Sequence, residues 1–299
     1  MDKLLQDLHI PYECDVPLAP LTWYGVGGPA RVLAHPSSVA QLSALAARCS
    51  AAGVEVYVLG AGANLLVRDE GVPGVVVRLD GTQFQQMSIS RGTVRVGAGY
   101  DLAKLVLETA KAGLSGLECL AGIPATVGGA VRMNAGGTFG DIGRSVARVQ
   151  VMDATGRVSS LDRDDLVFAY RYTNIVAKFI TDVALELTAG KPEVLRAEVQ
   201  RIFTLKSNSQ PLGAHCAGCA FKNPPPEAGA SAGQLIDRAG LKGFAIGGAQ
   251  VSPVHANFIV ARRDAGCTAR DILAVMEHAQ RVVAEKFGVK LEREVVVWP

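Results

Sequence analysis

The sequence predicts a two-lobed protein built from both helices and strands. In the first part of the chain, short runs rich in Val and Leu alternate with amphipathic stretches, and glycine turns separate them. After about residue 208 the chain becomes rich in loops before amphipathic segments return. The length of 299 residues fits about two domains, which need no disulfide or metal to bury a stable core. We therefore expect a larger lobe before residue 208 and a smaller lobe after it.

Capped amphipathic stretches predict the helices of the first lobe. Residues 37–53 begin with serines and end at a glycine, and Leu42 and Leu45 belong to an apolar stripe at helical spacing. Further helices are expected at residues 101–112 and from residue 192 to about residue 206. Strands are expected at the apolar runs bounded by turn residues, which are residues 56–59, 75–79, 94–96 and 149–152.

Fewer elements are expected in the second lobe. A short helix is expected at residues 232–239, and apolar strands are expected near Ala245 and Phe258. Thr268 and Asp271 stand in capping-box spacing and predict the start of a long final helix. The apolar stripe of this helix consists of Ile272, Val275, Ala279 and Val282.

Charge and hydropathy exclude several classes of protein. The 30 Lys and Arg residues nearly balance the 28 Asp and Glu residues, and no basic cluster stands out, so neither nucleic acid nor a membrane surface is an expected partner. No run of about 18 apolar residues occurs, and the N-terminus lacks the pattern of a secretion signal. We expect a cytoplasmic protein whose cysteines are reduced.

Two glycine-rich segments are candidates for binding phosphate or an aromatic ring. Gly60-Ala-Gly-Ala-Asn64 follows a predicted strand, and glycines let a backbone approach an anion closely. A dinucleotide fingerprint would need a third glycine at Leu65, so the alternative is a purely structural turn. Residues 121–137 contain five glycines among small residues and form the second candidate cradle, with a network of structural turns as the alternative.

Three further segments contain candidate catalytic groups. Arg171 can hold an anionic group. The alternative, which is more common for a lone arginine, is a side chain that extends from a strand edge into solvent. Lys222 follows Cys219 closely and can lower the pKa of its thiol, which can equally be an inert core residue. Alternation in a strand places Glu292 and Glu294 on one face, where a solvated strand end is the alternative.

A structural zinc site is not expected. Cys216 and Cys219 have the spacing of half a zinc site, but the chain contains no second pair with this spacing. His215 adjoins Cys216 directly, which is a poor distance for a shared metal ion. We therefore expect no metal.

Taken together, the motifs closely resemble the UDP-N-acetylenolpyruvoylglucosamine reductases of peptidoglycan synthesis, which are FAD enzymes. The matching strings occur in the family's order along nearly the whole chain. They are Thr22-Trp-Tyr-Gly-Val-Gly-Gly28, Leu59-Gly-Ala-Gly-Ala-Asn-Leu65, Gly122-Ile-Pro-Ala-Thr-Val-Gly-Gly129, Asn134-Ala-Gly-Gly137, Tyr170-Arg171, Gln210-Pro-Leu212, Ala217-Gly-Cys-Ala-Phe-Lys-Asn-Pro224, Ala239-Gly-Leu-Lys-Gly243, Gly247-Gly-Ala-Gln-Val251, His255-Ala-Asn-Phe258 and Leu291-Glu-Arg-Glu-Val295.

This resemblance implies an α+β fold. It consists of an FAD-binding lobe of the vanillyl-alcohol-oxidase (PCMH) type, made of two subdomains, and a smaller α/β substrate-binding lobe. The implied subdomains are residues 1–79, with the C-terminal strand 295–299 as a candidate addition, and residues 80–208, while residues 209–294 form the substrate-binding domain. The chain has no long insertion between Arg171 and Ile180, which matches the shorter of the family's two types.

The resemblance also implies the reaction. In the family, NADPH reduces a non-covalently bound FAD, and hydride then passes to UDP-N-acetylglucosamine enolpyruvate while an acid protonates the neighbouring carbon, which yields UDP-N-acetylmuramate. Negative charge spreads into the substrate carboxylate, so cationic and acidic groups there lower the barrier. By the resemblance, Arg171 and Glu294 stabilise this charge and Cys219 donates the proton.

The resemblance assigns the remaining site residues as well. The implied FAD-binding residues are Gly60, Ala61, Gly62, Ala63, Asn64, Leu65, Gly122, Ile123, Pro124, Thr126, Val127, Gly128, Gly129, Asn134, Ala135 and Gly136. The implied substrate-binding residues are Tyr170, Lys222 and Asn223.

One position departs from the family pattern. The family has a serine where this chain has Cys219. A thiol, with a pKa of about 8.5, is a much stronger acid than a hydroxyl, so proton donation can be preserved. A disulfide with Cys216 would block the donor.

Two other functions remain open alternatives. One is an FAD-dependent oxidase or dehydrogenase that acts on another small substrate. The other is a non-catalytic flavoprotein that senses redox state through Cys216 and Cys219. For the favoured function the expected partner is a UDP-sugar, and the expected oligomeric state is a monomer.

Overall fold

The computed structural model describes residues 2–299, which form two compact units. Unit 1 comprises residues 2–14, 32–61 and 74–205, and unit 2 comprises residues 15–31, 62–73 and 206–299. The sequence predicts one boundary near residue 208, whereas two stretches of the first 80 residues belong to unit 2. One reason is that strand β4 (Leu65–Val67) pairs in parallel with the C-terminal strand β20 (Val296–Trp298).

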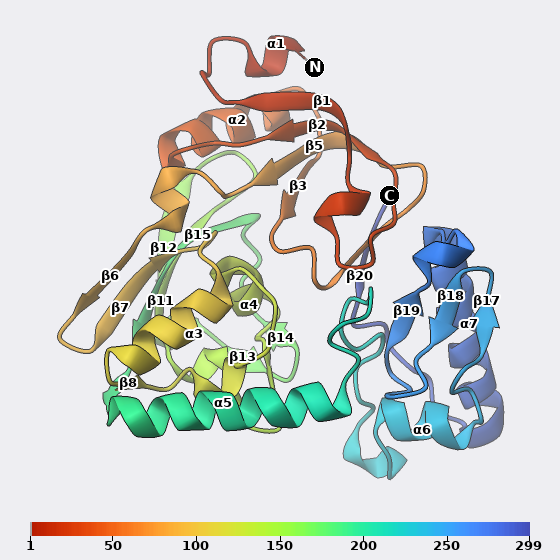
Figure 1. Cartoon of the computed structure of the whole chain (residues 1–299). Helices are drawn as coiled ribbons and strands as arrows, with labels where there is room; N and C mark the ends of the chain where they lie inside the picture. Colours follow the sequence, from red (N-terminus) through yellow and green to blue (C-terminus); the bar gives the residue numbers. More distant parts are fainter. Residues whose placement is uncertain (1) are drawn as a thin grey trace. The chain divides into compact units, whose positions relative to one another are not determined.

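Two sheets organise unit 1 (Figure 1). The larger is antiparallel, in the order β12-β11-β15-β7-β6, and the other has the order β1-β2-β5-β3. The strands of the larger sheet are β6 (Met87–Ser90), β7 (Thr93–Gly97), β11 (Val146–Met152), β12 (Val158–Asp162) and β15 (Phe179–Glu186). Those of the other sheet are β1 (Tyr12–Pro17), β2 (Pro29–Ala34), β3 (Val56–Leu59) and β5 (Val72–Arg78).

Short strand pairs and five helices complete this part of the chain. The pairs are β8 (Leu114–Ser115) with β16 (Thr188–Ala189), β9 (Gly136–Gly137) with β10 (Gly140–Asp141), and β13 (Phe168–Ala169) with β14 (Tyr172–Thr173). The helices are α1 (Asp2–Leu5), α2 (Val39–Ala51), α3 (Leu102–Lys111), α4 (Val127–Arg132) and α5 (Pro192–Ser209).

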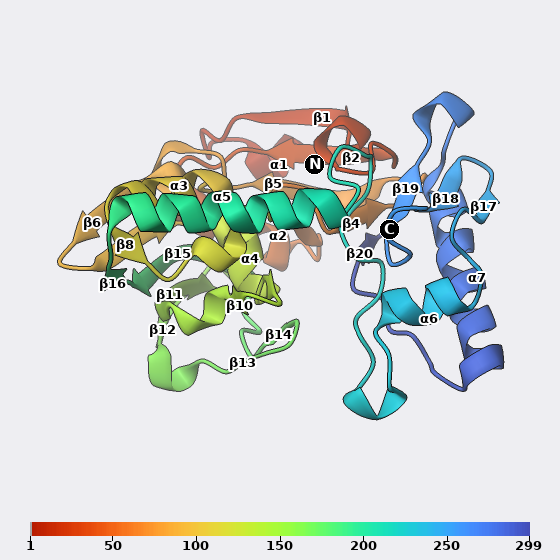
Figure 2. The same ribbon diagram turned by 60° about the horizontal axis from the view of Figure 1, so that its bottom comes forward.

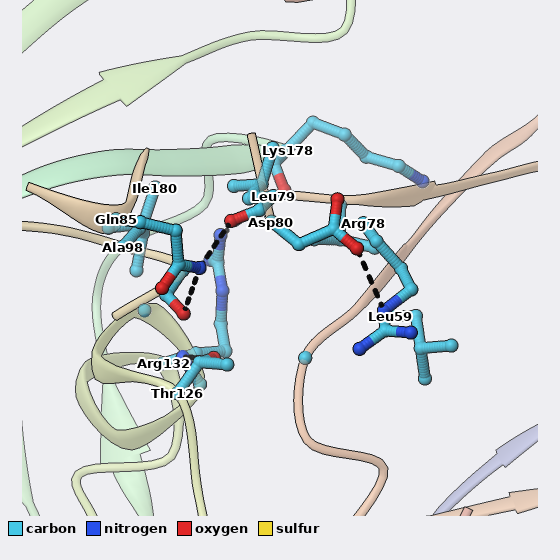
Figure 3. A pocket seen from close by; sticks show the side chains of 15 residues that line it. Leu59, Arg78, Leu79, Asp80, Gln85, Ala98, Thr126, Arg132, Lys178 and Ile180 are labelled. Atoms are coloured by element: carbon cyan, nitrogen blue, oxygen red, sulfur yellow. Dashed lines mark hydrogen bonds and ion pairs between the residues drawn. The ribbon is translucent and has the colours of Figure 1, made fainter. Parts of the chain in front are cut away.

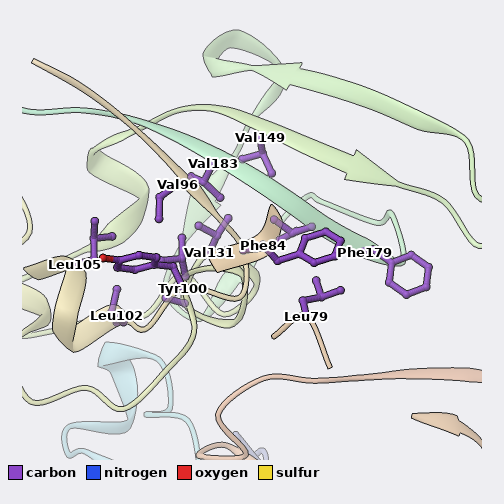
Figure 4. Close-up of a cluster of buried hydrophobic side chains, with 14 of the residues drawn as sticks. Leu79, Phe84, Val96, Tyr100, Leu102, Leu105, Val131, Val149, Phe179 and Val183 are labelled. Carbon is purple, nitrogen blue, oxygen red and sulfur yellow. The ribbon is translucent and has the colours of Figure 1, made fainter. Parts of the chain in front are cut away.

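The core of unit 1 lies between the larger sheet and its helices (Figure 4). Val96, Val149 and Val183 come from three neighbouring strands and are completely or almost completely buried. Leu105 of α3 and Val131 of α4 pack into the same cluster. Helix α3 forms here because its apolar residues recur on one face, and this core holds the glycine-rich segment around α4 in place.

Unit 2 contains a three-stranded sheet against which α7 packs (Figure 2). Its elements besides β4 and β20 are α6 (Ala232–Arg238), β17 (Ala245–Ile246), β18 (Ala249–Val251), β19 (Ile259–Ala261) and α7 (Ala269–Phe287). Short 3-10 helices occur along the whole chain at Ala19–Leu21, Thr82–Gln85, Glu118–Leu120, Ile142–Arg144, Arg163–Asp165, Pro226–Ala228 and Arg263–Ala265.

The helices expected from capping signals are confirmed. Ser38 and Asp101 accept hydrogen bonds from backbone amides at the start of α2 and α3, and Thr268 and Asp271 form the expected capping box of α7. Strand β18 was not expected, and neither were β1, β2, β6, β12 and β15 of unit 1. In α7 it is Val283, rather than the predicted Val282, that is completely buried. Within residues 2–299, no helix has the length and apolar character that a membrane crossing requires.

Candidate functional site

A cavity of about 200 Å³ lies in unit 1 at the carboxyl ends of the parallel strands β3 and β5 (Figure 3). Leu59 and Gly60 line it where β3 ends, and Arg78 and Asp80 line it where β5 ends. The opposite wall is glycine-rich and includes Gly128 of α4. Ligands of α/β proteins commonly bind at the carboxyl ends of parallel strands, so this cavity is the leading candidate cofactor site in unit 1.

Close backbone contacts explain the glycines of this cavity. A Cβ atom on Gly60 would lie 2.8 Å from Oγ1 of Thr126, and one on Gly128 would lie 2.9 Å from Cβ of Ala98. The Thr126 hydroxyl also accepts a hydrogen bond from the Gly129 amide at 3.3 Å. A side chain at Gly60 would therefore clash with Thr126, and one at Gly128 would clash with Ala98.

Positively charged side chains line the cavity, and carboxylates offset part of their charge. The guanidinium of Arg132 donates hydrogen bonds of 2.5 Å to the carbonyl oxygens of Ile175 and Ala177, and burial lowers the pKa of Arg132. Lys178 also lines the cavity. Since the carbonyl partners of Arg132 carry no net charge, its positive charge favours an anion in the cavity.

A small polar cluster stands at the rim. Asp80 lies between Arg78, at 3.6 Å, and His35, at 2.9 Å. The carboxylate of Asp80 therefore compensates the charge of Arg78. The sequence analysis did not predict the charged side chains that line the cavity, which are Arg78, Asp80, Arg132 and Lys178. Only Arg132 carried a signal, because it belongs to the glycine-rich segment 121–137.

The cavity is lined by some of the predicted FAD-binding residues only. Those that line it are Gly60, Thr126, Gly128 and Gly129. Those that do not line it are Ala61, Gly62, Ala63, Asn64, Leu65, Gly122, Ile123, Pro124, Val127, Asn134, Ala135 and Gly136. Leu65, Val127 and Ala135 are buried, so their side chains have little surface with which to contact a ligand.

The second half of the Gly60 loop belongs to unit 2 and has structural contacts there. Gly62 has a φ of +67°, and a Cβ atom would approach the carbonyl oxygen of Leu21 to 2.2 Å, so glycine is required. The side-chain amide of Asn64 donates a hydrogen bond of 3.2 Å to the carbonyl oxygen of Glu294. Asn64 thereby anchors the segment that contains a predicted catalytic residue.

Tyr170 and Arg171 form the turn between β13 and β14 in unit 1. Arg171 adopts a φ of +52°, which is uncommon for a residue with a side chain, and its guanidinium lies 5.3 Å from the centre of the Tyr170 ring. Asn134, which is buried, donates a hydrogen bond of 2.8 Å to the carbonyl oxygen of Ala169 and accepts one of 3.0 Å from the Gly143 amide. The hairpin that presents Arg171 is thus fixed at its base.

The predicted proton donor and its neighbours form a connected backbone network in unit 2. Cys219 is half-buried and precedes Ala220, whose carbonyl oxygen accepts a hydrogen bond of 2.9 Å from the Glu294 amide. Phe221 forms an antiparallel bridge with Arg293. The predicted strand at residues 292–294 is therefore only a single bridge, and the final strand begins at Val296. The structure places the segments of Cys219 and Glu294 side by side.

The predicted substrate-binding residues of this unit already have intramolecular partners. The ammonium group of Lys222 lies 2.5 Å from a carboxylate oxygen of Glu292. The side-chain oxygen of Asn223 accepts a hydrogen bond of 3.1 Å from the Ala232 amide at the start of α6. The Glu292 carboxylate therefore offsets the charge of Lys222, which reduces the expected effect of Lys222 on the Cys219 thiol.

A buried tyrosine lies beside the cysteines of unit 2. Tyr24 is fully buried, and among residues 2–299 its hydroxyl has no hydrogen-bond partner. Burial, reinforced by the nearby Cys216, raises the pKa of Tyr24. Burial also raises the pKa of Cys216. The Cys216 thiol is therefore kept protonated, which makes it a poor nucleophile for disulfide exchange.

All six cysteines are thiols, and no disulfide joins Cys216 to Cys219 in the described chain. In the same residues, no three His, Cys, Asp or Glu side chains are grouped so that they could hold a metal ion. The structure brings Cys219 and Glu294 together in unit 2, while Arg171 and Tyr170 belong to unit 1.

The chain is similar to known proteins along nearly its whole length. The profile of the FAD binding domain matches residues 30–162, and that of the C-terminal domain of UDP-N-acetylenolpyruvoylglucosamine reductase matches residues 210–298. The UDP-N-acetylenolpyruvoylglucosamine reductase of Desulfosudis oleivorans is 44% identical over 295 residues, which cover 95% of this chain and 93% of that protein. The protein of the same name from Bacillus subtilis is 37% identical and covers 99% of this chain and 98% of its own.

A solved structure is similar as well. The crystal structure of UDP-N-acetylenolpyruvylglucosamine reductase from Thermus caldophilus superimposes with a TM-score of 0.82 at 39% sequence identity. The similarity covers 97% of this chain and 99% of that one. Fold and sequence therefore agree on the same relatives.

Proposed function

Because this chain belongs to the UDP-N-acetylenolpyruvoylglucosamine reductase family, we propose that it reduces UDP-N-acetylglucosamine enolpyruvate to UDP-N-acetylmuramate. Membership makes it an FAD-dependent oxidoreductase of peptidoglycan synthesis with NADPH as the reductant. Its fold is the PCMH-type FAD-binding fold with a C-terminal α/β domain. The observation that carries the proposal is the similarity over the full length, which includes both domains.

The cavity of unit 1 fits part of the FAD molecule. Gly60, Gly128 and Gly129 would let the cofactor approach the backbone, and Arg132 and Lys178 would face its pyrophosphate. The hydrogen bonds of Arg132 to carbonyl oxygens support this assignment, because these uncharged partners do not offset its positive charge. Among the remaining predicted FAD-binding residues, the buried Leu65, Val127 and Ala135 would contribute through their backbones.

The three predicted parts of the chain would bind different ligands. Residues 1–79 and 80–208 would hold FAD, with residues 295–299 as a candidate addition, and residues 209–294 would hold the UDP-sugar. Lys222 and Asn223 would face the substrate, as would Tyr170 from unit 1. To bind the substrate diphosphate, Lys222 would have to exchange the Glu292 carboxylate for phosphate oxygens.

The chemistry requires a hydride, which bound FAD supplies after reduction by NADPH, and one proton. Cys219 would donate that proton from its thiol to the substrate carbon next to the one that receives the hydride. Arg171 would bind the substrate carboxylate, and its unusual φ of +52° is supported by the anchored hairpin. Glu294 would stabilise the developing charge from the segment beside Cys219.

Separating the two half-reactions tests this proposal. We expect the visible flavin bands of the purified protein to bleach with NADPH under anaerobic conditions and to return when UDP-N-acetylglucosamine enolpyruvate is added. A colourless protein that takes up no FAD would contradict the cofactor assignment. Bands that bleach but do not return would favour an oxidase or dehydrogenase of another substrate.

Variants at Cys219 test the proton donor. Cys219→Ala should be reduced by NADPH normally but should reoxidise with substrate about 100-fold more slowly or worse, because general acid catalysis typically contributes that much. Cys219→Ser should retain much of the rate. The exposed Cys14 provides the control, since Cys14→Ala should change neither half-reaction. Normal substrate reduction by Cys219→Ala would contradict the assignment. The expected monomeric state and cytoplasmic location stay predictions.

A further inference from the structure

Asn257 connects the segments on which the two predicted catalytic residues of unit 2 lie. It is 3% exposed and lies in the turn between β18 and β19. Its side-chain oxygen accepts a hydrogen bond of 3.0 Å from the Phe221 amide, and its side-chain nitrogen donates one of 2.8 Å to the Phe221 carbonyl oxygen. The side chain thus pairs with both backbone polar groups of a single residue, as a strand neighbour would.

The backbone of Asn257 holds the preceding residue too. Its carbonyl oxygen accepts a hydrogen bond of 2.7 Å from the Ala220 amide. The other polar group of Ala220, its carbonyl oxygen, accepts from the Glu294 amide. Ala220 is therefore held between Asn257 and Glu294, and it directly follows Cys219 in the chain.

The surroundings leave these groups few other partners. Ala220 is fully buried and Phe221 is 1% exposed, so water cannot easily replace a lost hydrogen bond. The turn that carries Asn257 is itself anchored, because the Asn257 amide donates to Nδ1 of His255 at 3.2 Å. The side-chain amide of Asn257 is therefore the part of the connection between this turn and the Cys219 segment that a substitution can remove.

We propose that Asn257 is a positioning residue that sets the Cys219 thiol relative to Glu294 through Ala220 and Phe221. This inference rests on the proposed roles of Cys219 and Glu294. Asparagine suits the position because its amide offers one acceptor and one donor on a short side chain. A proton donor must lie within hydrogen-bond distance of the atom it protonates, so a small shift of this segment lowers the rate of proton transfer without removing the donor.

Two variants and a matched control separate positioning from folding. Asn257→Asp keeps the shape and the acceptor for the Phe221 amide, but it sets a second acceptor against the Phe221 carbonyl oxygen. Asn257→Leu removes both bonds. Gln250→Leu is the control, because Gln250 lies in β18 and its side chain donates a hydrogen bond of 3.0 Å to the carbonyl oxygen of Gly243, which belongs to neither predicted catalytic segment.

We expect the holoenzyme of Asn257→Asp to be reduced by NADPH at the wild-type rate. Reoxidation by UDP-N-acetylglucosamine enolpyruvate should be slowed about 10- to 100-fold, with a smaller change in KM than in kcat. The loss should shrink as the pH falls, because a protonated aspartic acid can donate to the Phe221 carbonyl oxygen again. Gln250→Leu should match the wild type in both half-reactions.

Amide hydrogen exchange provides a readout that does not depend on activity. Exchange at Phe221 and Glu294 should be faster in Asn257→Asp and Asn257→Leu than in Gln250→Leu. If Asn257→Leu does not fold, Asn257→Asp still decides the question. Wild-type reoxidation and wild-type exchange in Asn257→Asp would overturn the inference. That outcome differs from a failure of the proposed function, in which the substrate would not reoxidise even the wild-type protein. It also differs from a failure of the Cys219 assignment, in which Cys219→Ala would reduce substrate normally.

Discussion

Asn134 donates a hydrogen bond of 2.8 Å to the carbonyl oxygen of Ala169, the residue that precedes the Tyr170-Arg171 turn. Asn257 has the corresponding role in unit 2, where it holds Phe221 two residues after Cys219. In both units a buried asparagine fixes the backbone next to a predicted catalytic residue. This arrangement lets the predicted catalytic side chains remain accessible while their backbones are rigid.

Removal of the Asn134 amide should destabilise unit 1. Asn134→Ala loses two buried hydrogen bonds and places alanine at a φ of +41°, so we expect the free energy of unfolding to fall by about 2 kcal/mol or more. Urea titration measures this change. Asn174→Ala is the matched control, because the exposed Asn174 side chain also accepts one hydrogen bond from a backbone amide and donates one to a backbone carbonyl oxygen. Its removal should lower the free energy of unfolding by less than about 1 kcal/mol. Equal losses for both variants would contradict this account.

Replacement of Arg132 should weaken FAD binding. Arg132→Met keeps much of the volume but removes the positive charge that lines the cavity. Loss of a charge-assisted contact to phosphate should raise the FAD dissociation constant about tenfold or more, as measured by flavin fluorescence during dilution of the holoenzyme. Arg48→Met removes a hydrogen bond of 2.5 Å to the Gln6 carbonyl oxygen outside the cavity and should leave the dissociation constant unchanged. An unaltered dissociation constant in Arg132→Met would place the pyrophosphate elsewhere.

Asp69 should stabilise the start of α7. Its carboxylate oxygens accept hydrogen bonds from the amides of Ala269 and Arg270 at 2.8 and 3.0 Å. We expect Asp69→Ala to lower the free energy of unfolding by about 1 kcal/mol, which is typical of a lost N-terminal cap. Glu70→Ala removes an exposed ion pair at 3.9 Å and should cost less than about 0.5 kcal/mol. Thermal unfolding of the two variants measures both losses, and a larger loss for Glu70→Ala than for Asp69→Ala would contradict this assignment.

The free energy of unfolding should decrease when the pH falls below about 6.5, the ordinary pKa of a histidine side chain. Burial, with a smaller contribution from Lys242, lowers the pKa of His255. The unfolded chain then binds more protons than the folded chain once the pH drops below about 6.5, so this contribution to stability is complete above that pH and is lost at lower pH. His255→Gln should show a smaller decrease in urea midpoint between about pH 7 and pH 5. An identical pH profile would mean that His255 is not the responsible group.

Local signals in the sequence predicted the longer helices, although not α1 and α4, and they marked the glycine-rich segments. Ser38, Asp101 and Thr268 cap helices through amides only three residues away, so sequence spacing alone contains the interaction. The glycines at 60 and 128 were recognisable because few other residues permit so close an approach. Resemblance to a family supplied the reaction, which no periodicity in the chain could have revealed.

The tertiary structure alone decided which polar groups meet. Asp69 caps a helix 200 residues away, and Asn257 binds a residue 36 positions before it. Arg132 lines a cavity together with Leu59 of β3, Arg78 of β5 and Lys178, which are far apart in the sequence. Such contacts depend on chain segments brought together by burial of the cores, and neither hydrophobic periodicity nor residue spacing encodes the partner of a single polar side chain. The sequence thus determined the elements and the chemistry available, and packing determined which of those groups act together.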